Sequence, residues 1–482
     1  MPAELLAIDQ GTTSSRAIRF DLDGRPLQTA QREFAQHYPR PGWVEHDANE
    51  IWETTLATAR EVMSDDVKAI GITNQRETVV LWDRTTGKPV HNAIVWQDRR
   101  TADLCDALKA DGLEPMVQGK TGLVLDPYFS ATKIKWLLDA VPNARENRDL
   151  AIGTIDSFLL WHLTGGKVHA TDWTNAGRTM LYDIHARAWD AELLSLFDIP
   201  EWLLPKVRDN VAEFGDTDLF GRSIPILGMV GDQQAALVGQ ACFERGMVKS
   251  TYGTGCFMLM NTGDPVASQA RLLTTPAYAI GDQRAYALEG SIFVAGSAIK
   301  WLRDKLKLID DAAETEALAK SARADHGITV IPAFVGLGAP HWRANLRGSI
   351  HGLTLDTTDA DLVRATLESI AFQTRDLTDA MKADGATKPS ALRIDGGMSQ
   401  NGWFAQLLAD VLDTPVERPA SHETTALGAA ALAGIGAGLY SDAADFGRRW
   451  QAGARWEPQL PAQDRDTMLD NWKAVLERAL AQ

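Results

Sequence analysis

The sequence predicts an α/β protein whose two duplicated halves face each other across a cleft. The first observation is a strand, a turn rich in glycine and hydroxyl residues, and a second strand at Leu5 to Phe20. The second is the recurrence of this pattern at Gly246 to Met260, half a chain length later. Such a recurrence indicates an internal duplication, with halves at 1–240 and 241–482.

A third observation is that apolar strands end in an acid beside small or polar turn residues at Asp9, Asp232 and Asp395. Glycines at a strand end let a ligand approach the backbone closely. Each acid also has an ordinary interpretation, as a turn residue or a helix N-cap. Their repetition in one chain favours a ligand site between the halves.

Size and composition limit the class of protein. The 482 residues are too many for one core, so two large domains are expected. The net charge of −16 argues against nucleic acid as the main partner. Three cysteines without CxxC spacing exclude a zinc motif. The longest apolar tract, Thr425 to Leu439, is shorter than the ~20 residues that span a bilayer. The sequence begins directly with a strand and without a signal peptide, so we expect no membrane insertion and a cytoplasmic location.

The first turn has the chemistry of a phosphate site. Backbone N–H groups and hydroxyls gathered in a tight turn bind anionic oxygens, and Mg²⁺ prefers carboxylate and phosphate oxygens. The residues that could serve are Asp9, Thr12, Thr13, Ser14 and Arg16. By contrast, Gly119-Lys120-Thr121 is not a P-loop, because position 114 is Glu and not Gly.

The rest of the first half alternates strands with helices. Expected strands are a third one after the Asp21–Gly24 turn, and 67–73, 79–82, 93–96 and 224–230; expected helices are 48–64 and one entered from the loop at 125–129. Arg76 and Glu77 lie between two of these strands, either as an exposed pair or as a grip on a hydroxylated substrate. Tyr128 is either core or a ligand hydroxyl. Asp232 is placed either to cap a helix or to act as a catalytic base.

The second half repeats this alternation. A strand and a helix are expected at 288–302, a strong amphipathic helix at 358–376, strands at 392–395 and 416–419, and polar helix from Ser441 onward.

These motifs give the chain its resemblance to a known family. The segments that carry it are AIDQGTTSSR (7–16), GWVEHD (42–47), GITNQRET (71–78), AIVWQDRR (93–100), GLVLDPYFSATKIKW (122–136), GDQQAALVGQ (231–240), TYGTGCFMLMNTG (251–263), FVGLGAP (334–340), RATLESIAFQTRD (364–376) and DGG (395–397). The chain resembles the FGGY carbohydrate kinases of the actin-like ATPase superfamily, and within them the branch that phosphorylates glycerol. The resemblance implies two duplicated ribonuclease H-like (actin-like ATPase) domains with an interdomain cleft.

The resemblance also implies roles for individual residues. Glycerol hydroxyls would be bound by Arg76, Glu77, Tyr128, Asp232 and Gln233, and its carbons would lie against Trp96 and Phe257. Phosphates would be bound by Thr12, Thr13, Ser14, Arg16 and Thr254, and the nucleotide by Gly296, Gly397 and Asn401. Asp9 would lie near Mg²⁺, and Asp232 would be the general base. The implied reaction converts ATP and glycerol to ADP and sn-glycerol 3-phosphate, the first step of glycerol catabolism, in a homodimer or homotetramer.

Two positions depart from the family pattern. Lys300 stands where enteric members carry Gln, and the loop 338–348 differs from the commoner form, which leaves the roles of both open. The alternatives are an FGGY kinase for another polyol or ketose, an ATP-driven chaperone of the same superfamily, and an enzyme relic that acts as a sensor. We expect a chaperone to need a peptide-binding domain after the second half, for which the sequence leaves no room.

Overall fold

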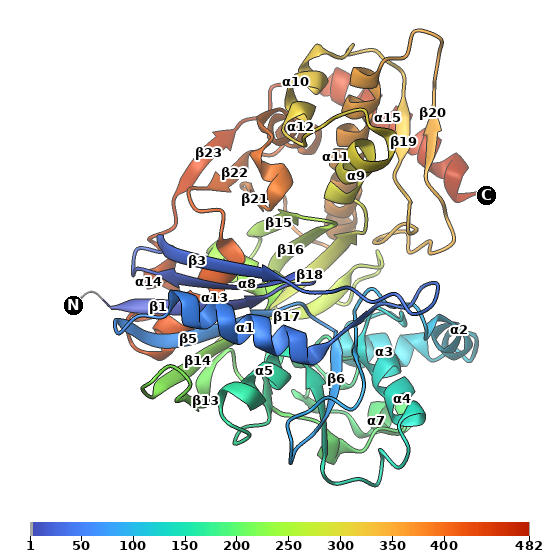
Figure 1. The fold of residues 1–482 in the computed structure, drawn as a ribbon. Coiled ribbons are helices and arrows are strands. Elements are labelled where there is room, and N and C mark those ends of the chain that lie inside the picture. Colours follow the sequence, from blue (N-terminus) through green and yellow to red (C-terminus); the bar gives the residue numbers. More distant parts are fainter. Residues whose placement is uncertain (1–2, 482) are drawn as a thin grey trace.

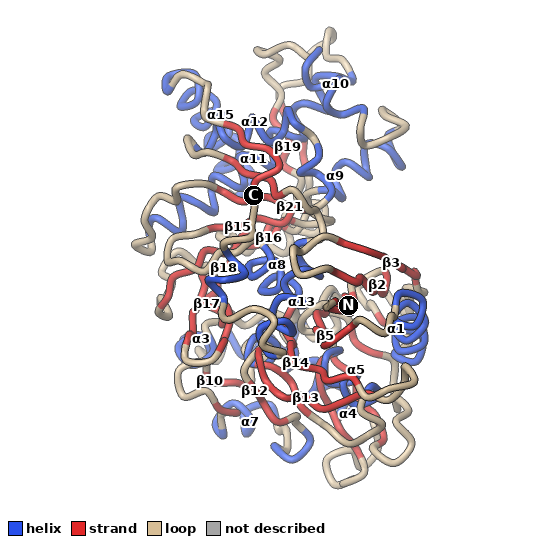
Figure 2. Tube along the Cα trace, turned by 90° about the vertical axis from the view of Figure 1, so that its left-hand side faces the viewer, coloured by secondary structure: helices blue, strands red, loops and turns tan. Residues whose placement is uncertain are grey.

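The computed structural model describes residues 3–481 and contains two large mixed sheets, stacked one above the other (Figures 1 and 2). The first sheet has the strand order β13-β14-β5-β1-β2-β3. Its strands are β1 (Glu4–Gln10), β2 (Ser14–Phe20), β3 (Pro26–Glu33), β5 (Val67–Asn74), β13 (Val211–Thr217) and β14 (Ile224–Gly231). β5 runs parallel to β1 and β14, while β2, β3 and β13 are antiparallel to their neighbours.

The second sheet has the order β17-β18-β16-β15-β21-β22-β23. Its strands are β15 (Val248–Tyr252), β16 (Cys256–Gly263), β17 (Leu273–Ile280), β18 (Gln283–Ile292), β21 (Leu392–Asp395), β22 (Val416–Pro419) and β23 (Ala452–Trp456). β21 runs parallel to β15 and β22, and the outer strand β23 is antiparallel.

The two sheets share one topology, which confirms the duplication expected from the sequence. The antiparallel run β1-β2-β3 corresponds to β15-β16-β18, and the parallel strands β5 and β14 correspond to β21 and β22. Each sheet also ends in an antiparallel edge strand, β13 or β23, and only the second carries an addition, β17. The first half also contains a smaller sheet with the order β4-β7-β6-β8, whose strands are β4 (Glu45–His46), β6 (Val79–Asp83), β7 (Ala93–Ile94) and β8 (Leu150–Thr154).

Helices cover the faces of these sheets (Figure 1). They are α1 (Ala48–Val62), α2 (Ala102–Ala110), α3 (Glu114–Thr121), α4 (Ser130–Ala140), α5 (Ile155–Leu163), α6 (Trp173–Ala176), α7 (Ala191–Phe197), α8 (Asp232–Gly239), α9 (Gly296–Trp301), α10 (Glu314–Ser321), α11 (Asp359–Ala383), α12 (Gly402–Leu412), α13 (Thr424–Gly436), α14 (Ala443–Gly447) and α15 (Ala462–Leu480). Within residues 3–481, no helix is both long and apolar enough to cross a membrane.

Two expectations about elements were wrong. The strand expected at 93–96 stops at Ile94, because β7 finds strand partners only at Val79 and at Glu45–His46. The chain after Ser441 is not entirely helical, because β23 joins the edge of the second sheet. As an edge strand, β23 has no fully buried residue, so its sequence lacks the apolar alternation that identifies a strand.

Two helices rich in small residues lie between the sheets and tie the halves together (Figure 2). α13 comes from the second half, yet its buried alanines belong to the same core as Leu5 and Ala7 of β1. α8 packs against α13 at Gly239 and Gly428, where an added Cβ would overlap the backbone of the opposite helix. Because α8 begins at Asp232, this close packing fixes a predicted site residue at the junction of the halves.

Candidate active site

Two charged residues are buried where β5 ends. Arg76 and Glu77 follow Asn74, the last residue of β5, and neither is exposed. Glu77 has a φ of 61°, a left-handed conformation that is costly for a residue with a side chain. Strained residues of this kind concentrate at functional sites. The exposed ion pair considered for these residues is therefore not what the structure contains.

Arg76 and Glu77 belong to a four-residue ionic cluster completed by Arg178 and Glu289. The Glu289 carboxylate accepts from Arg76 Nη1 at 2.7 Å, from Arg76 Nη2 at 3.0 Å and from Arg178 Nη2 at 3.0 Å. Arg178 Nε donates to Glu77 Oε1 at 2.6 Å. Two positive and two negative charges balance, which is how buried charges are tolerated. Sequence reasoning missed Arg178 and Glu289.

Arg76 also connects this cluster to Asp232 and Tyr128. Arg76 Nε lies 3.2 Å from Asp232 Oδ1, and Arg76 Nη2 donates to the Tyr128 hydroxyl at 3.4 Å. The side chain of Asp232 is 29% exposed, whereas those of Arg76 and Glu77 are at most 2% exposed. Burial raises the pKa of Asp232, although Arg76 and Lys249 pull it down. Asp232 is thus a partly accessible carboxylate. Its position is fixed by Arg76, which is itself fixed by Glu289.

An aromatic wall borders these polar groups. The ring of Trp96 lies 5.6 Å from Tyr128 and 6.3 Å from Phe257, edge to face in both cases. Trp96 Nε1 donates to Thr12 Oγ1 at 2.9 Å, which connects the wall to the first turn. Trp96 and Phe257 also line a cavity of about 540 Å³ that reaches Thr254 and Trp342. Since Trp96 belongs to the first half and the other three to the second, this cavity is an interdomain cleft.

At the first turn, Arg16 contacts both Asp9 and a residue of the second half. Asp9 and Arg16 pair across the β1–β2 hairpin, and Arg16 Nη2 donates to Asp9 Oδ2 at 3.1 Å. Arg16 also forms an ion pair with Glu423, which precedes α13 and was not expected. Burial raises the pKa of Asp9, and its carboxylate is close enough to raise that of Asp232.

The hydroxyl residues of this turn differ in their surroundings. The Ser14 hydroxyl accepts from Gln31 Nε2 at 2.9 Å, and the Ser14 carbonyl accepts from the N–H of Gly11 at 2.9 Å. Thr13 is exposed, and the Thr12 hydroxyl accepts from Trp96. The turn is therefore closed by its own backbone, and of Thr12, Thr13 and Ser14 only Thr13 is fully at the surface.

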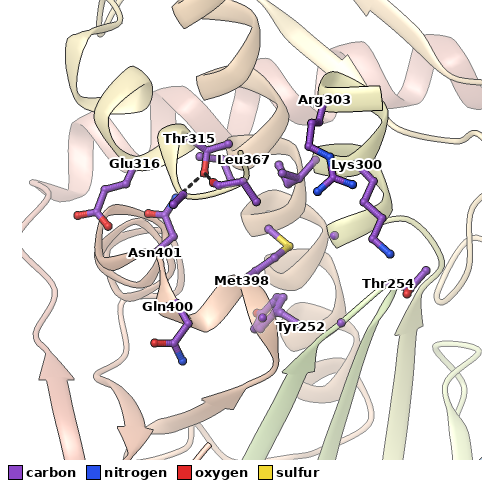
Figure 3. Close-up of a pocket in the computed structure, with 16 residues that line it drawn as sticks. Tyr252, Thr254, Lys300, Arg303, Thr315, Glu316, Leu367, Met398, Gln400 and Asn401 are labelled. Atoms are coloured by element: carbon purple, nitrogen blue, oxygen red, sulfur yellow. Dashed lines mark hydrogen bonds between the residues drawn. The ribbon is translucent and has the colours of Figure 1, made fainter. Parts of the chain in front are cut away.

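A second cavity, of about 400 Å³, lies within the second half (Figure 3). The four residues that the sequence assigned to phosphate and nucleotide on this side all line it: Thr254, Gly296, Gly397 and Asn401. Asn401 caps α12 by accepting from the N–H of Phe404 at 2.9 Å, and its Nδ2 donates to Thr315 at 3.1 Å.

Lys300 also lines this cavity and extends from α9 toward Thr254 in Figure 3. Apolar side chains, Leu367 and Met398 among them, line the middle part of the cavity. A cavity with an apolar middle and a cation at one end suits a flat base with a charged tail.

The third strand-end acid has a different place from the other two. Asp395 is buried and its Oδ2 accepts from Gln240 Nε2 at 2.8 Å, at the end of α8. It therefore anchors the central helix, whereas Asp9 and Asp232 lie at the site.

The chain matches known protein families over most of its length. A model described as the FGGY family of carbohydrate kinases, N-terminal domain, matches residues 5–239, and the corresponding C-terminal domain matches residues 248–437.

Individual relatives match from end to end. A glycerol kinase of Rhodospirillum centenum is 58% identical over 98% of this chain and 97% of its own length, and one of Ectopseudomonas mendocina is 56% identical over the whole of both. A crystal structure of Plasmodium falciparum glycerol kinase with ADP covers 100% of this chain and 99% of its own, with a TM-score of 0.93 and 38% identity. A gluconate kinase structure from Lactobacillus acidophilus, at 22% identity, covers 100% of this chain and 98% of its own with a TM-score of 0.89 and shares the fold.

Proposed function

The chain belongs to the FGGY family of carbohydrate kinases, and we propose that it transfers the γ-phosphoryl group of ATP to glycerol, giving ADP and sn-glycerol 3-phosphate. The observation that carries this proposal is the meeting of Arg76, Tyr128 and Asp232 beside the aromatic wall of the cleft. Glycerol has three hydroxyls and a short carbon chain. The polar side chains of the site match the hydroxyls, and the aromatic wall matches the carbon chain.

The polar groups would orient the triol. Arg76 would donate to a hydroxyl, and the carboxylate of Glu77 and the Tyr128 hydroxyl would bind the others. Trp96 and Phe257 would lie against the carbons of the triol. Phosphoryl transfer depends mainly on positioning and charge neutralisation, so such orientation is the main contribution of these residues.

Asp232 would act as the general base. In the reaction the primary hydroxyl oxygen forms a bond to the γ-phosphorus, the proton of that hydroxyl passes to Asp232, and the bond from phosphorus to the bridging oxygen breaks to release ADP. A base must lie within hydrogen-bond reach of the proton that it takes. Asp232 is accessible, and Arg76 Nε fixes one of its oxygens.

Both turns would hold the phosphates, with Thr12, Thr13, Ser14 and Arg16 on one side and Thr254 on the other, and Gly296, Gly397 and Asn401 would contact the nucleotide. Asp9 fits Mg²⁺, because in residues 3–481 only its Oδ2 receives a hydrogen bond, and Mg²⁺ needs few protein ligands beside substrate phosphates. When bound, Mg²⁺ would neutralise charge on the phosphate oxygens. Arg16 would keep the Asp9 carboxylate in place.

Closure of the two domains, 1–240 and 241–482, would exclude water, which competes with glycerol as acceptor. We also propose a homodimer or homotetramer in the cytoplasm, on the strength of the family alone.

The test is an ADP-release assay with Mg-ATP and four acceptors: glycerol, xylulose, ribulose and gluconate. Turnover with glycerol far above that with the sugars is the expected result. Turnover with a sugar and not with glycerol would refute the substrate assignment while leaving the family unaffected. No turnover with any acceptor would refute the proposed activity and favour the sensor alternative.

A further inference from the structure

A fully buried lysine that the proposed mechanism does not use lies directly beside the site. Lys249 is in β15, a central strand of the second sheet, and has no exposed surface. Its ammonium donates to Gln233 Oε1 at 2.7 Å, to Thr251 Oγ1 at 2.9 Å and to the Phe257 carbonyl at 3.4 Å. A buried charge is costly unless it is paired and hydrogen-bonded, so its presence requires an explanation.

Lys249 is not free to bind a ligand itself. An ammonium group has three N–H donors, and protein acceptors occupy all three. Acidic side chains nearby, those of Asp395, Asp232 and Glu289, compensate its charge. Any effect on the reaction must therefore pass through one of its three partners.

Gln233 is the partner that leads to the substrate. Because an ammonium has no acceptor, the atom of the Gln233 amide that faces it must be the oxygen. The amide nitrogen then points away from Lys249. Within residues 3–481 no group accepts a hydrogen bond from Gln233 Nε2, and this nitrogen is not among the buried unpartnered atoms. Gln233 therefore presents only a donor to the site.

This fixed direction constrains the hydroxyl that Gln233 meets. A hydroxyl that accepts from Gln233 Nε2 keeps its single proton free to donate elsewhere. Asp232, the residue before Gln233, has only acceptors when it is ionised. We propose that Lys249 is a positioning residue, which holds Gln233 as a donor to the acceptor hydroxyl so that the proton of this hydroxyl is directed to Asp232. The inference rests on the proposed function, since it places Gln233 and Asp232 at one hydroxyl of the substrate.

A double-mutant cycle tests the proposal. Lys249→Met retains the length of the side chain without its charge, and should lower kcat/KM for glycerol by about 10- to 100-fold, the range for losing a hydrogen bond to a charged group. The KM for ATP should change by less than about twofold, since the nucleotide contacts remain. In a Gln233→Ala background, Lys249→Met should cost under about threefold, because its target is absent.

Ser250→Ala is the matched control on the same strand. Within residues 3–481 the Ser250 hydroxyl makes its hydrogen bond to Cys256 Sγ, away from Gln233, so its loss should leave glycerol kinetics unchanged. An equal cost of Lys249→Met in both backgrounds would overturn the proposal, because Lys249 would then act on the structure in general.

A second variant keeps the test decisive if Lys249→Met does not fold. Gln233→Glu retains an acceptor for Lys249 and gains an ion pair, but replaces the outward donor with an acceptor. We expect an unchanged or higher Tm together with a loss in kcat/KM for glycerol of about 100-fold. Wild-type kinetics in Gln233→Glu would refute the fixed direction. If the wild type prefers another polyol, only the proposed function fails, and the same cycle is measured with that polyol.

Discussion

Arg76 and Glu289 form a buried bidentate ion pair that joins the two halves behind the substrate site. Nη1 and Nη2 of Arg76 lie 2.7 and 3.0 Å from the two carboxylate oxygens. Although burial raises the pKa of Glu289, Arg178 and Arg76 lower it to about 2. The pair therefore stays ionised above that pH. Because Glu289 holds the far edge of the guanidinium, the Nε edge remains for Asp232.

Glu289→Gln should lower the free energy of unfolding strongly, although Gln and Glu have nearly the same size. Removing one partner of a buried ion pair leaves an uncompensated charge, which costs about 3–5 kcal/mol. Urea unfolding of both proteins measures this. Glu61→Gln is the control, because its partner Arg32 lies with it at the surface and both side chains are about half exposed. The control should cost at most about 1 kcal/mol. An equal cost for both variants would contradict the assigned role of Glu289.

Asp232→Asn should lower kcat by about 10²- to 10⁴-fold, the usual contribution of a positioned base. The fold should survive, since an Asn oxygen still accepts from the Gln233 backbone N–H, 2.7 Å away in the wild type. Steady-state kinetics with a thermal melt of each protein separates the two effects. A near-normal kcat with an unchanged Tm would remove Asp232 from the role of base.

The strand-end residues of the site could be located from the sequence, because an apolar strand and the polar residue at its end are neighbours in the chain. Asp9 lies at the end of the apolar strand β1, and Arg76 and Asp232 follow the apolar strands β5 and β14. The carboxyl ends of parallel strands meet at one edge of a sheet. The same local rule included Asp395, whose bond to Gln240 depends on the packing of α8.

Arg178 and Glu289 escaped prediction because their ionic partners are far away in the sequence. Lys249 escaped it because it lies inside a strand and not at a strand end. Glu289 lies within the strand β18, and Lys249 within β15. A charge in a buried strand indicates that some partner exists, but its identity depends on how the halves meet. The alanines and glycines of α13 allow close packing, but they do not specify the sheet of the other half as its partner.

Gly397→Ala should weaken nucleotide binding without affecting the fold. An added Cβ at Gly397 meets no protein atom within 4 Å, and this residue lines the cavity of the second half. Overpacking costs typically 1–3 kcal/mol, so KM for ATP should rise by about 5- to 100-fold. Gly119→Ala, another open position but outside the site, is the control and should change neither KM. An unchanged KM for ATP in Gly397→Ala would show that the nucleotide lies elsewhere.

A pair of buried acids should make stability fall as pH rises. Burial and the neighbouring Asp156 carboxylate raise the pKa of Asp172 to about 7, and burial also raises that of Asp156. In the unfolded chain both pKa values return to about 3.9. At a pH between the unfolded and the folded pKa values, the folded protein binds more protons than the unfolded chain. Its free energy of unfolding therefore decreases as pH rises, by up to about 1.4 kcal/mol per pH unit for each extra proton bound.

Asp156→Asn should flatten this dependence. The substitution removes one charge, so the pKa of Asp172 should fall and the protein should lose less stability between pH 5 and pH 8. The hydroxyls of Thr154 and Thr171, which donate to Asp156 at 2.5 and 2.6 Å, can rotate to accept from an amide. Urea unfolding at each pH measures the slope for both proteins. Parallel slopes would mean that the two acids do not share a proton-binding site in the folded state. A shallower slope with equal or higher stability at pH 8 is the expected result. The wild type keeps two acids in a site without a compensating cation among their hydrogen-bond partners in residues 3–481.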